Sequence, residues 1–134
     1  MRTFDVQFIE IACDYERAFH YISKPENLVE WTAAFKAVRN GRATMRTLQG
    51  ELEIGLEVKA SQSVGNVDWF MTMPDGNVGR AFSRLVRNQP DTTIYTFVLM
   101  APPVPLEEVE GTLEQQMRIL RQELAHLKEV LEKA

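Results

Sequence analysis

The most constraining feature of this sequence is a strict alternation of apolar and polar residues between positions 51 and 58. Leucine, isoleucine or valine stands at every second position of this run, and glutamate or glycine stands between them. Successive side chains of a β-strand point to opposite faces, so the run predicts a sheet with one apolar face and one solvated face. Such a sheet buries its apolar face only if another element covers it.

The C-terminal part of the chain supplies an apolar helical stripe that fits this need. After the stiff connection Ala101-Pro102-Pro103-Val104-Pro105, helix-forming residues continue to Ala134. Apolar residues recur in this segment at alternating spacings of four and three, which is typical of one helix face: Leu113, Met117, Leu120, Leu124, Leu127 and Leu131. We expect this helix to pack on the sheet of its own chain. The same spacing is found in coiled coils, so a homodimer through this helix is the alternative.

The N-terminal part of the chain predicts one strand followed by two short helices. Residues Phe4–Ala12 are rich in β-forming side chains. Asp14 is a capping residue for a helix over Tyr15–Ser23. Pro25 ends that helix and begins a second one, which reaches Trp31.

The middle of the chain predicts an antiparallel meander. Between Phe35 and Leu99, short β-rich runs are separated by turn-forming residues. The turns are expected at Asn40-Gly41, Gln49-Gly50, Ser63–Asn66, Pro74–Asn77 and Asn88–Asp91. Short connections of this kind join strands that are neighbours in the sheet.

The turn Pro74-Asp75-Gly76-Asn77 sets the expected register of the central hairpin. Asp-Gly at its centre indicates a two-residue loop. Such a loop puts four pairs on the apolar face of the sheet: Met73 opposite Val78, Met71 opposite Arg80, Trp69 opposite Phe82, and Val67 opposite Arg84. The next turn adds three large residues to that face: Tyr95, Phe97 and Leu99.

This register places the Arg80 guanidinium in the middle of an apolar surface. Burying an arginine without a partner is costly. Either Arg80 lines a cavity and contacts an anionic or carbonyl-bearing ligand, or it forms an internal ion pair with Glu110 or Glu114 of the C-terminal helix. The sequence leaves both interpretations open.

Length, charge and cysteine content exclude several classes of protein. A length of 134 residues fits one domain over residues 1–134 with a single core. A net charge of −4 and the lack of a Lys/Arg cluster argue against nucleic-acid binding. Cys13 is the single cysteine, which excludes an internal disulfide and a Cys-rich zinc site. The sequence shows neither a secretory leader nor a membrane-spanning stretch, so we expect a cytoplasmic protein without membrane insertion.

The segment between Glu16 and Trp31 reads ERAFHYISKPENLVEW. It resembles the "helix, Pro-Glu-Asn-Leu, Trp" segment of the START-like (SRPBCC) superfamily, specifically its bacterial polyketide cyclase/dehydrase and lipid-transport group. Lys24 stands where that family often has a capping Asp. The element order is similar over essentially the whole chain. The resemblance implies an α+β helix-grip fold, in which a curved, seven-stranded antiparallel sheet wraps around a long C-terminal helix and two short helices follow the first strand.

The resemblance also implies a cavity between sheet and helix that binds a small apolar or aromatic molecule, without fixing the ligand or an activity. We expect the wall of this cavity to comprise Trp31, Phe35, Trp69, Met71, Arg80, Phe82, Tyr95, Phe97, Leu99, Met117 and Leu120. The superfamily supplies no catalytic residue that can be carried over to this chain.

The candidate reactive residues support two main hypotheses about function. His20 and His126 have no partners at metal-ligand spacing, and no nucleophile elbow or phosphate loop is present, so we expect no metal and no cofactor. The leading hypothesis is a non-catalytic carrier or sensor in which Arg80 and Tyr95 orient the ligand. The alternative is a polyketide cyclase/dehydratase-type enzyme in which Arg80 polarises a carbonyl and Tyr95 or His20 transfers a proton. A third possibility is an interaction domain with a filled cavity and an exposed apolar patch outside it.

Overall fold

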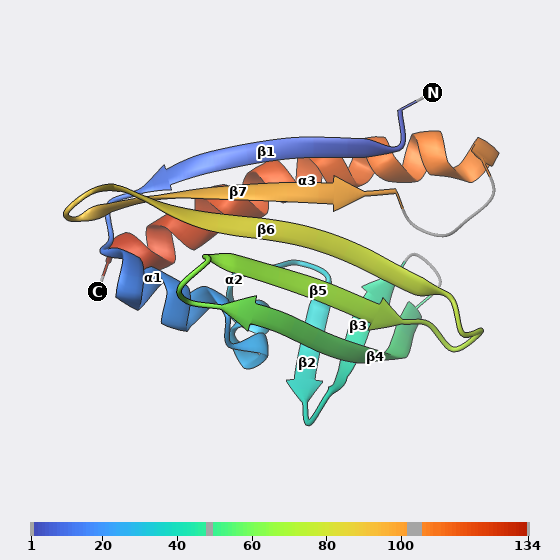
Figure 1. Ribbon diagram of the computed structural model, residues 1–134. Helices are drawn as coiled ribbons and strands as arrows, with labels where there is room; N and C mark the ends of the chain where they lie inside the picture. The colour runs from blue at the N-terminus through green and yellow to red at the C-terminus, as the bar shows by residue number, and fades with distance from the viewer. Residues whose placement is uncertain (1, 48–49, 102–105, 134) are drawn as a thin grey trace.

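The computed structural model describes residues 2–47, 50–101 and 106–133, with side chains left out of the description for residues 106–112. In this described part, seven antiparallel strands form one sheet in the order β1-β7-β6-β5-β4-β3-β2 (Figure 1). The strands are β1 (Phe4–Ile11), β2 (Phe35–Arg39), β3 (Arg42–Thr47), β4 (Gly50–Ser61), β5 (Asn66–Thr72), β6 (Val78–Gln89) and β7 (Thr92–Met100). The helices are α1 (Tyr15–Ile22), the 3-10 turn η1 (Pro25–Asn27), α2 (Leu28–Trp31) and α3 (Leu106–Glu132).

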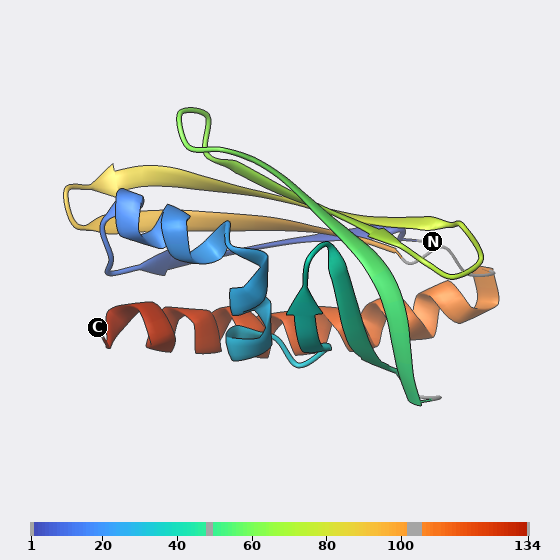
Figure 2. The same cartoon turned by 90° about the horizontal axis from the view of Figure 1, so that it is seen from below.

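The sheet and α3 form two layers (Figure 2). The sheet curls so that β2, β3 and β4 come down beside α3, and α1 and α2 lie near the C-terminal half of α3. The apolar stripe of α3 is buried at Leu113, Leu120, Leu124, Leu127 and Leu131. This stripe therefore packs inside its own chain, and it is not free to form a coiled-coil seam. The expected helix-grip architecture is confirmed.

The first helix begins where its capping residue predicts. The Asp14 carboxylate accepts a hydrogen bond from the backbone N–H of Arg17 at 3.1 Å. This bond satisfies one of the N–H groups that a helix start leaves without an intrahelical partner. Pro25 then opens η1, where its missing N–H costs nothing.

The central hairpin has a three-residue loop, so the expected two-residue loop is wrong. Met73 donates its backbone N–H to Asn77 O at 2.8 Å, which closes a loop of Pro74, Asp75 and Gly76. Pro74 favours the first position of a type I turn, and Gly76, at φ 90°, supplies the left-handed residue that completes a three-residue hairpin loop. The Asp75 carboxylate accepts from the backbone N–H of Asn77 at 2.9 Å and stabilises this form.

The longer loop shifts the register between β5 and β6 by one residue. The inward and outward side chains of β6 are thereby exchanged. Arg80 pairs with Phe70 and not with Met71, and Ala81 pairs with Trp69. Because side chains alternate along a strand, a shift of one residue moves all of them to the other face. The residues of β6 expected to face water are therefore the inward ones: Gly79, Ala81, Ser83 and Leu85.

Arg80, Phe82 and Arg84 lie on the outer face, so their expected inward positions are wrong. Arg80 is exposed on the side of the sheet opposite α3. It neither lines the inner surface nor pairs with Glu114, and the side chain of Glu110 lies outside the described residues. Phe82 contacts the edge of Phe70 on the outer face, with ring centroids 6.2 Å apart.

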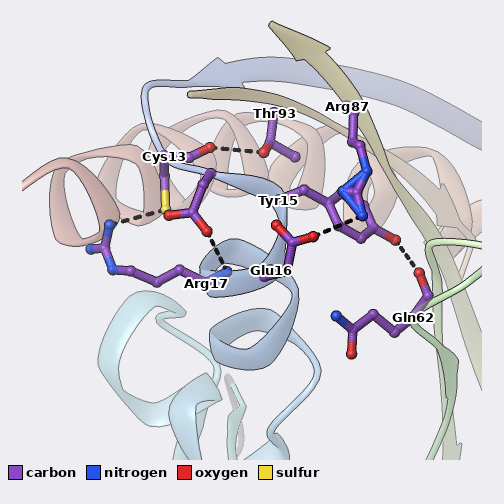
Figure 3. A network of polar contacts seen from close by, with 8 residues as sticks. Cys13, Tyr15, Glu16, Arg17, Gln62, Arg87 and Thr93 are labelled. Atoms are coloured by element: carbon purple, nitrogen blue, oxygen red, sulfur yellow. Dashed lines mark hydrogen bonds and ion pairs between the residues drawn. The ribbon is translucent and has the colours of Figure 1, made fainter. Parts of the chain in front are cut away.

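A polar network holds the start of α1 against the sheet (Figure 3). The Tyr15 hydroxyl donates to Gln62 O at 2.6 Å, and the Arg87 guanidinium lies 4.1 Å from the centre of the Tyr15 ring. Arg87 also pairs with Glu16 at 2.8 Å. These contacts join α1 to the β4–β5 turn and to β6, far apart in sequence.

Further polar contacts of this network surround Cys13 (Figure 3). The Thr93 hydroxyl donates to Cys13 O at 2.8 Å, and the Arg17 guanidinium donates to Cys13 Sγ at 3.1 Å. Arg17 also donates to the carbonyl of Leu131 near the end of α3. The base of α1 is thereby tied to both β7 and α3.

We predict that Gly65→Ala destabilises the protein by about 3 kcal/mol in urea unfolding, since strain and a core clash combine. Gly65 has φ 95°, and an added Cβ would lie 2.3 Å from Leu85 O. The matched control is Gly76→Ala, at φ 90° with no atom within 4 Å of the added Cβ. The control should lose only about 1 kcal/mol, the cost of a left-handed alanine. Equal losses in the two variants would contradict the assigned clash.

Candidate inner-surface binding site

The inner surface of the sheet, which faces α3, is apolar. Large side chains of β5 and β7 stand on either side of a strip of small residues in β6. The inward positions of these three strands are Val67, Trp69 and Met71; Gly79, Ala81, Ser83 and Leu85; and Tyr95, Phe97 and Leu99. The terminal methyl groups of Met71 and Met73 lie over Gly79, within 3.8 Å of where its Cβ would stand. Methionine is flexible and polarisable, so this part of the wall is adaptable.

This inner surface is closed at one end and partly open at the other. Tyr95 and Leu85, near α1, are at most 1 % exposed. Toward the β5–β6 hairpin, four apolar side chains of the same surface are half-buried: Met71, Met73, Phe97 and Leu99. Solvent therefore reaches an apolar surface that a filled core would cover.

An aromatic cluster forms the closed end. Trp31 of α2 packs against Tyr95 of β7 edge to face, with ring centroids 6.5 Å apart. Tyr95 packs in the same manner against Phe97, at 6.2 Å. Trp69 of β5 belongs to the same buried core. Three elements distant in sequence thus bring their aromatic side chains to one place.

Three polar atoms of this cluster are buried without a hydrogen-bond partner among the described residues: Trp31 Nε1, Trp69 Nε1 and Tyr95 Oη. Burial raises the pKa of the Tyr95 hydroxyl above its usual range, although the nearby Ser83 and Trp69 polar groups counter this effect in part. These neighbours lie close to Tyr95 Oη without meeting hydrogen-bond geometry. Buried polar groups are normally paired, so three unpaired ones in one cluster require an explanation.

A pocket of about 300 Å³ adjoins the cluster between α3 and the connection from α2 to β2. Its lining residues are Trp31, Thr32, Ala33, Ile119, Gln122, Glu123 and His126. The Glu123 carboxylate accepts a hydrogen bond from the backbone N–H of Ala33 at 2.6 Å. Burial raises the pKa of Glu123, and the backbone N–H groups of Ala33 and Ala34 counter this in part. Trp31 contributes both to this pocket and to the aromatic cluster.

The structure brings most of the expected wall together. Trp69, Met71, Tyr95, Phe97 and Leu99 lie on the inner surface, and Trp31, Phe35 and Leu120 are buried in the same core. Met117 is half-buried on α3, and its carbonyl accepts from the Gln7 side chain at 2.9 Å. Arg80 and Phe82 are the two that lie elsewhere. Whether the remaining residues contact a ligand stays a prediction.

Two features of the site were not predicted from the sequence: the inward residues of β6 and the carboxylate of Glu123. The signal for β6 was Pro74, which favours the first position of a three-residue loop over the two-residue loop that Asp-Gly indicates. Glu123 had no comparable signal, because its contact with Ala33 joins residues 90 positions apart.

The outer face carries an exposed apolar patch on the edge strand β1. Phe4, Val6 and Phe8 are 48 %, 50 % and 75 % exposed. This is the patch that an interaction domain requires. The partly open inner surface, however, disagrees with the filled cavity that the same interpretation requires.

No family model matches this chain, and no curated protein sequence is similar to it. Solved structures are similar in fold. A START superfamily protein from Mycobacterium smegmatis is 15 % identical, with a TM-score of 0.68 over 98 % of this chain and 99 % of that one. The di-domain ARO/CYC BexL from the BE-7585A biosynthetic pathway is 12 % identical, with a TM-score of 0.69 over 96 % of this chain and 46 % of that one. The Aha1 dimer from Colwellia psychrerythraea is 16 % identical, with a TM-score of 0.63 over 98 % of this chain and 97 % of that one.

These similarities establish a START-like fold, in agreement with the resemblance drawn from the segment between Glu16 and Trp31. At identities of this size they describe the fold alone, because one fold hosts many functions. In the described residues, no helix is long and apolar enough to cross a membrane.

We predict that Glu123→Gln makes unfolding stability less dependent on pH. A raised pKa means that the folded protein holds this proton more tightly than the unfolded chain. The associated stability is therefore present below the ordinary value of 4.5 and is lost as the pH rises through the folded pKa. Glutamine keeps an acceptor for Ala33 N–H but does not titrate.

The measurement is urea unfolding of wild type and Glu123→Gln from about pH 4 to about pH 7. The free energy of unfolding of Glu123→Gln should rise relative to that of wild type as the pH rises. Glu129→Gln, at an exposed position of the same helix, is the control and should follow wild type. A Glu123→Gln curve parallel to wild type would contradict the prediction.

Proposed function

We propose that this START-like domain binds a small apolar or aromatic molecule between the inner surface of the sheet and α3, as a carrier or sensor. The observation that carries the proposal is the half-exposure of Met71, Met73, Phe97 and Leu99. Ligand sites are concave and mostly apolar, with a few polar groups. A surface of this composition that stays accessible within a two-layer fold fits that description.

The wall of the proposed site consists of large residues from five elements. It comprises Trp31, Phe35, Trp69, Met71, Tyr95, Phe97, Leu99, Met117 and Leu120. Ala81 and Ser83 of β6 form its floor, because their small side chains lie between Trp69 and the residues of β7. The pocket beside Trp31 adds space at the lower end of the usual size of small-molecule sites.

The enzymatic alternative has less support. A neighbour in fold is named as an ARO/CYC of a biosynthetic pathway. The mechanism considered for this chain, however, needs Arg80 and either Tyr95 or His20 in one site. Arg80 is exposed on the outer face, and His20 is exposed on α1. Burial raises the pKa of Tyr95, which opposes its use as a base.

We predict that Leu99→Trp lowers affinity for an apolar dye such as Nile red about tenfold, a loss of about 1.4 kcal/mol of binding free energy. The larger ring would occupy accessible space on the inner surface. The matched control is Met100→Trp, because Met100 is the next residue and faces outward opposite Phe4. The control should bind the dye as wild type does. Fluorescence titration measures both.

A second pair of variants provides an independent test if Leu99→Trp fails to fold. Met71→Trp changes the inner surface, and Thr72→Trp changes the exposed neighbour on the outer face. Thermal unfolding identifies which variants are folded. If folded inner-face and outer-face variants bind the dye equally, the proposed site is wrong.

A further inference from the structure

We propose that two copies of this chain associate edge to edge through β1, as antiparallel strands related by a twofold axis at Val6. The proposal is independent of the ligand site, because the exposed side chains concerned lie on the outer face of the sheet. Three observations carry it: open backbone groups along the edge, exposed apolar side chains on the same residues, and an order of residue types that is complementary to itself.

The backbone of β1 is open at the border of the sheet. β1 is an edge strand, paired with β7 alone (Figure 1). Ala101 donates its backbone N–H to Thr3 O at 2.8 Å, so Thr3 and every second residue after it bond β7. The N–H and C=O groups of Phe4, Val6 and Phe8 therefore point away from the sheet. No hydrogen bond between described residues reaches them at this edge.

The same three residues carry the exposed apolar side chains of the strand. Phe4, Val6 and Phe8 are 48 %, 50 % and 75 % exposed. Beyond Phe8 the edge is covered, since Lys128 Nζ donates to the carbonyl of Glu10 at 2.9 Å. Open backbone groups and exposed apolar side chains thus coincide over Phe4–Phe8.

The two edge strands of the sheet differ in how they are protected. β2, at the opposite border, contains Lys36 and Arg39, and its register is irregular between Phe35 and Ala37. Lysine and bulges are usual means by which a sheet avoids pairing with another chain. β1 contains neither lysine nor proline, and its pairing with β7 is regular throughout. β1 is therefore the edge that is open to addition of a strand.

The order of residue types along β1 fits pairing with a second copy. Antiparallel pairing about Val6 places Phe4 opposite Phe8 of the second copy, so aromatic pairs form on both sides of the axis. At the ends, Arg2 lies opposite Glu10 of the second copy, and both side chains are exposed. The outer-face pattern Arg-x-Phe-x-Val-x-Phe-x-Glu is thus complementary to itself in size and in charge.

Neighbouring registers are less favourable. An axis at Asp5 would place two Asp5 carboxylates opposite each other, and an axis at Gln7 would place a glutamate opposite a phenylalanine. With the axis at Val6, Asp5 lies opposite the neutral Gln7. The Arg2 guanidinium, 3.2 Å from Asp5, has further N–H donors for Glu10 of the second copy.

The surface that this pairing covers is small. Phe4 and Phe8 together expose about 250 Å² in each copy, taking about 200 Å² for a whole phenylalanine. Val6 and the edge backbone add to this area, and the total stays below that of a standard stable interface. We therefore expect a Kd on the order of 10 µM. A twofold contact uses the same surface on both copies, so it forms no species larger than a dimer.

Sedimentation velocity over a dilution series from about 1 µM to about 200 µM measures the association. Val6→Lys places two lysines opposite each other at the axis and should raise the Kd at least about tenfold. The matched control is Val64→Lys, because Val64 is 55 % exposed and lies in the turn between β4 and β5. The control should dimerise as wild type does. Thermal unfolding identifies which variants are folded.

Disulfide formation tests the register. Val6→Cys brings two thiols together at the axis, where opposed Cα atoms lie about 5.5 Å apart, within reach of a disulfide. Phe8→Cys is the control, because its two thiols would lie about 14 Å apart along the strands. Mild oxidation above the Kd should link Val6→Cys into a covalent dimer. Phe8→Cys and wild type, whose Cys13 is buried, should remain single chains.

Each contrary result overturns the proposal. A chain that stays monomeric at the highest concentration has no such interface. A dimer that Val6→Lys leaves intact, or that Val64→Lys weakens equally, uses another surface. Species that grow beyond two copies contradict the twofold contact, and equal linking of Val6→Cys and Phe8→Cys contradicts the register. If Val6→Lys fails to fold, the dilution series of wild type and the two cysteine variants decide the outcome.

Discussion

The architecture of the inner surface depends on one short loop, Pro74–Gly76. Its three residues, closed by the hydrogen bond from Met73 N to Asn77 O and braced by Asp75, set which face of β6 points toward α3. A loop of two residues would put arginine and phenylalanine on the inner surface, and the observed loop puts glycine, alanine and serine there. Because β6 lies between β5 and β7, this choice determines whether the centre of the sheet is filled or has small side chains between large ones. The accessible apolar surface and its uncharged character both follow from it.

The cover of that surface is set by a second constraint, the pairing of a one-sided sheet with a one-sided helix. The stripe of α3 buries five leucines, and the apolar face of the sheet cannot be removed from water without it. Two hydrogen bonds fix the relative position of the layers. The Gln7 side chain bonds the Met117 carbonyl, and Arg17 bonds the Leu131 carbonyl. The layers are thus joined near the middle and near the C-terminal end of α3, and the half-exposed part of the inner surface lies toward the hairpin.

Most of the fold and part of the site could be predicted from sequence. The capped helix after Asp14, the break at Pro25, the alternating strand and the stripe of α3 depend on local residue types and their spacing, and the structure has all four. Trp69 and Met71 lie on the expected face because β5 precedes the loop, and Tyr95, Phe97 and Leu99 lie on it because they pair with Leu85, Ser83 and Ala81, the inward residues of β6. Arg80 and Phe82 were misplaced because their face depended on a loop length, and Asp-Gly and Pro74 indicate different lengths. A single residue in that loop reverses every side chain of the following strand.

What the sequence determined by itself is the set of elements and their apolar faces, since these depend on interactions between residues a few positions apart. What the tertiary structure alone decided is which side chains meet. Trp31 of α2, Trp69 of β5 and Tyr95 of β7 form one cluster in which three polar atoms have no hydrogen-bond partner among the described residues, and the Glu123 carboxylate accepts from the backbone N–H of Ala33. Burial and hydrogen bonding depend on atoms brought together from distant parts of the chain. No local pattern predicts that the Tyr95 hydroxyl is fully buried beside Ser83 and Trp69, because that property belongs to the packing of several elements around it.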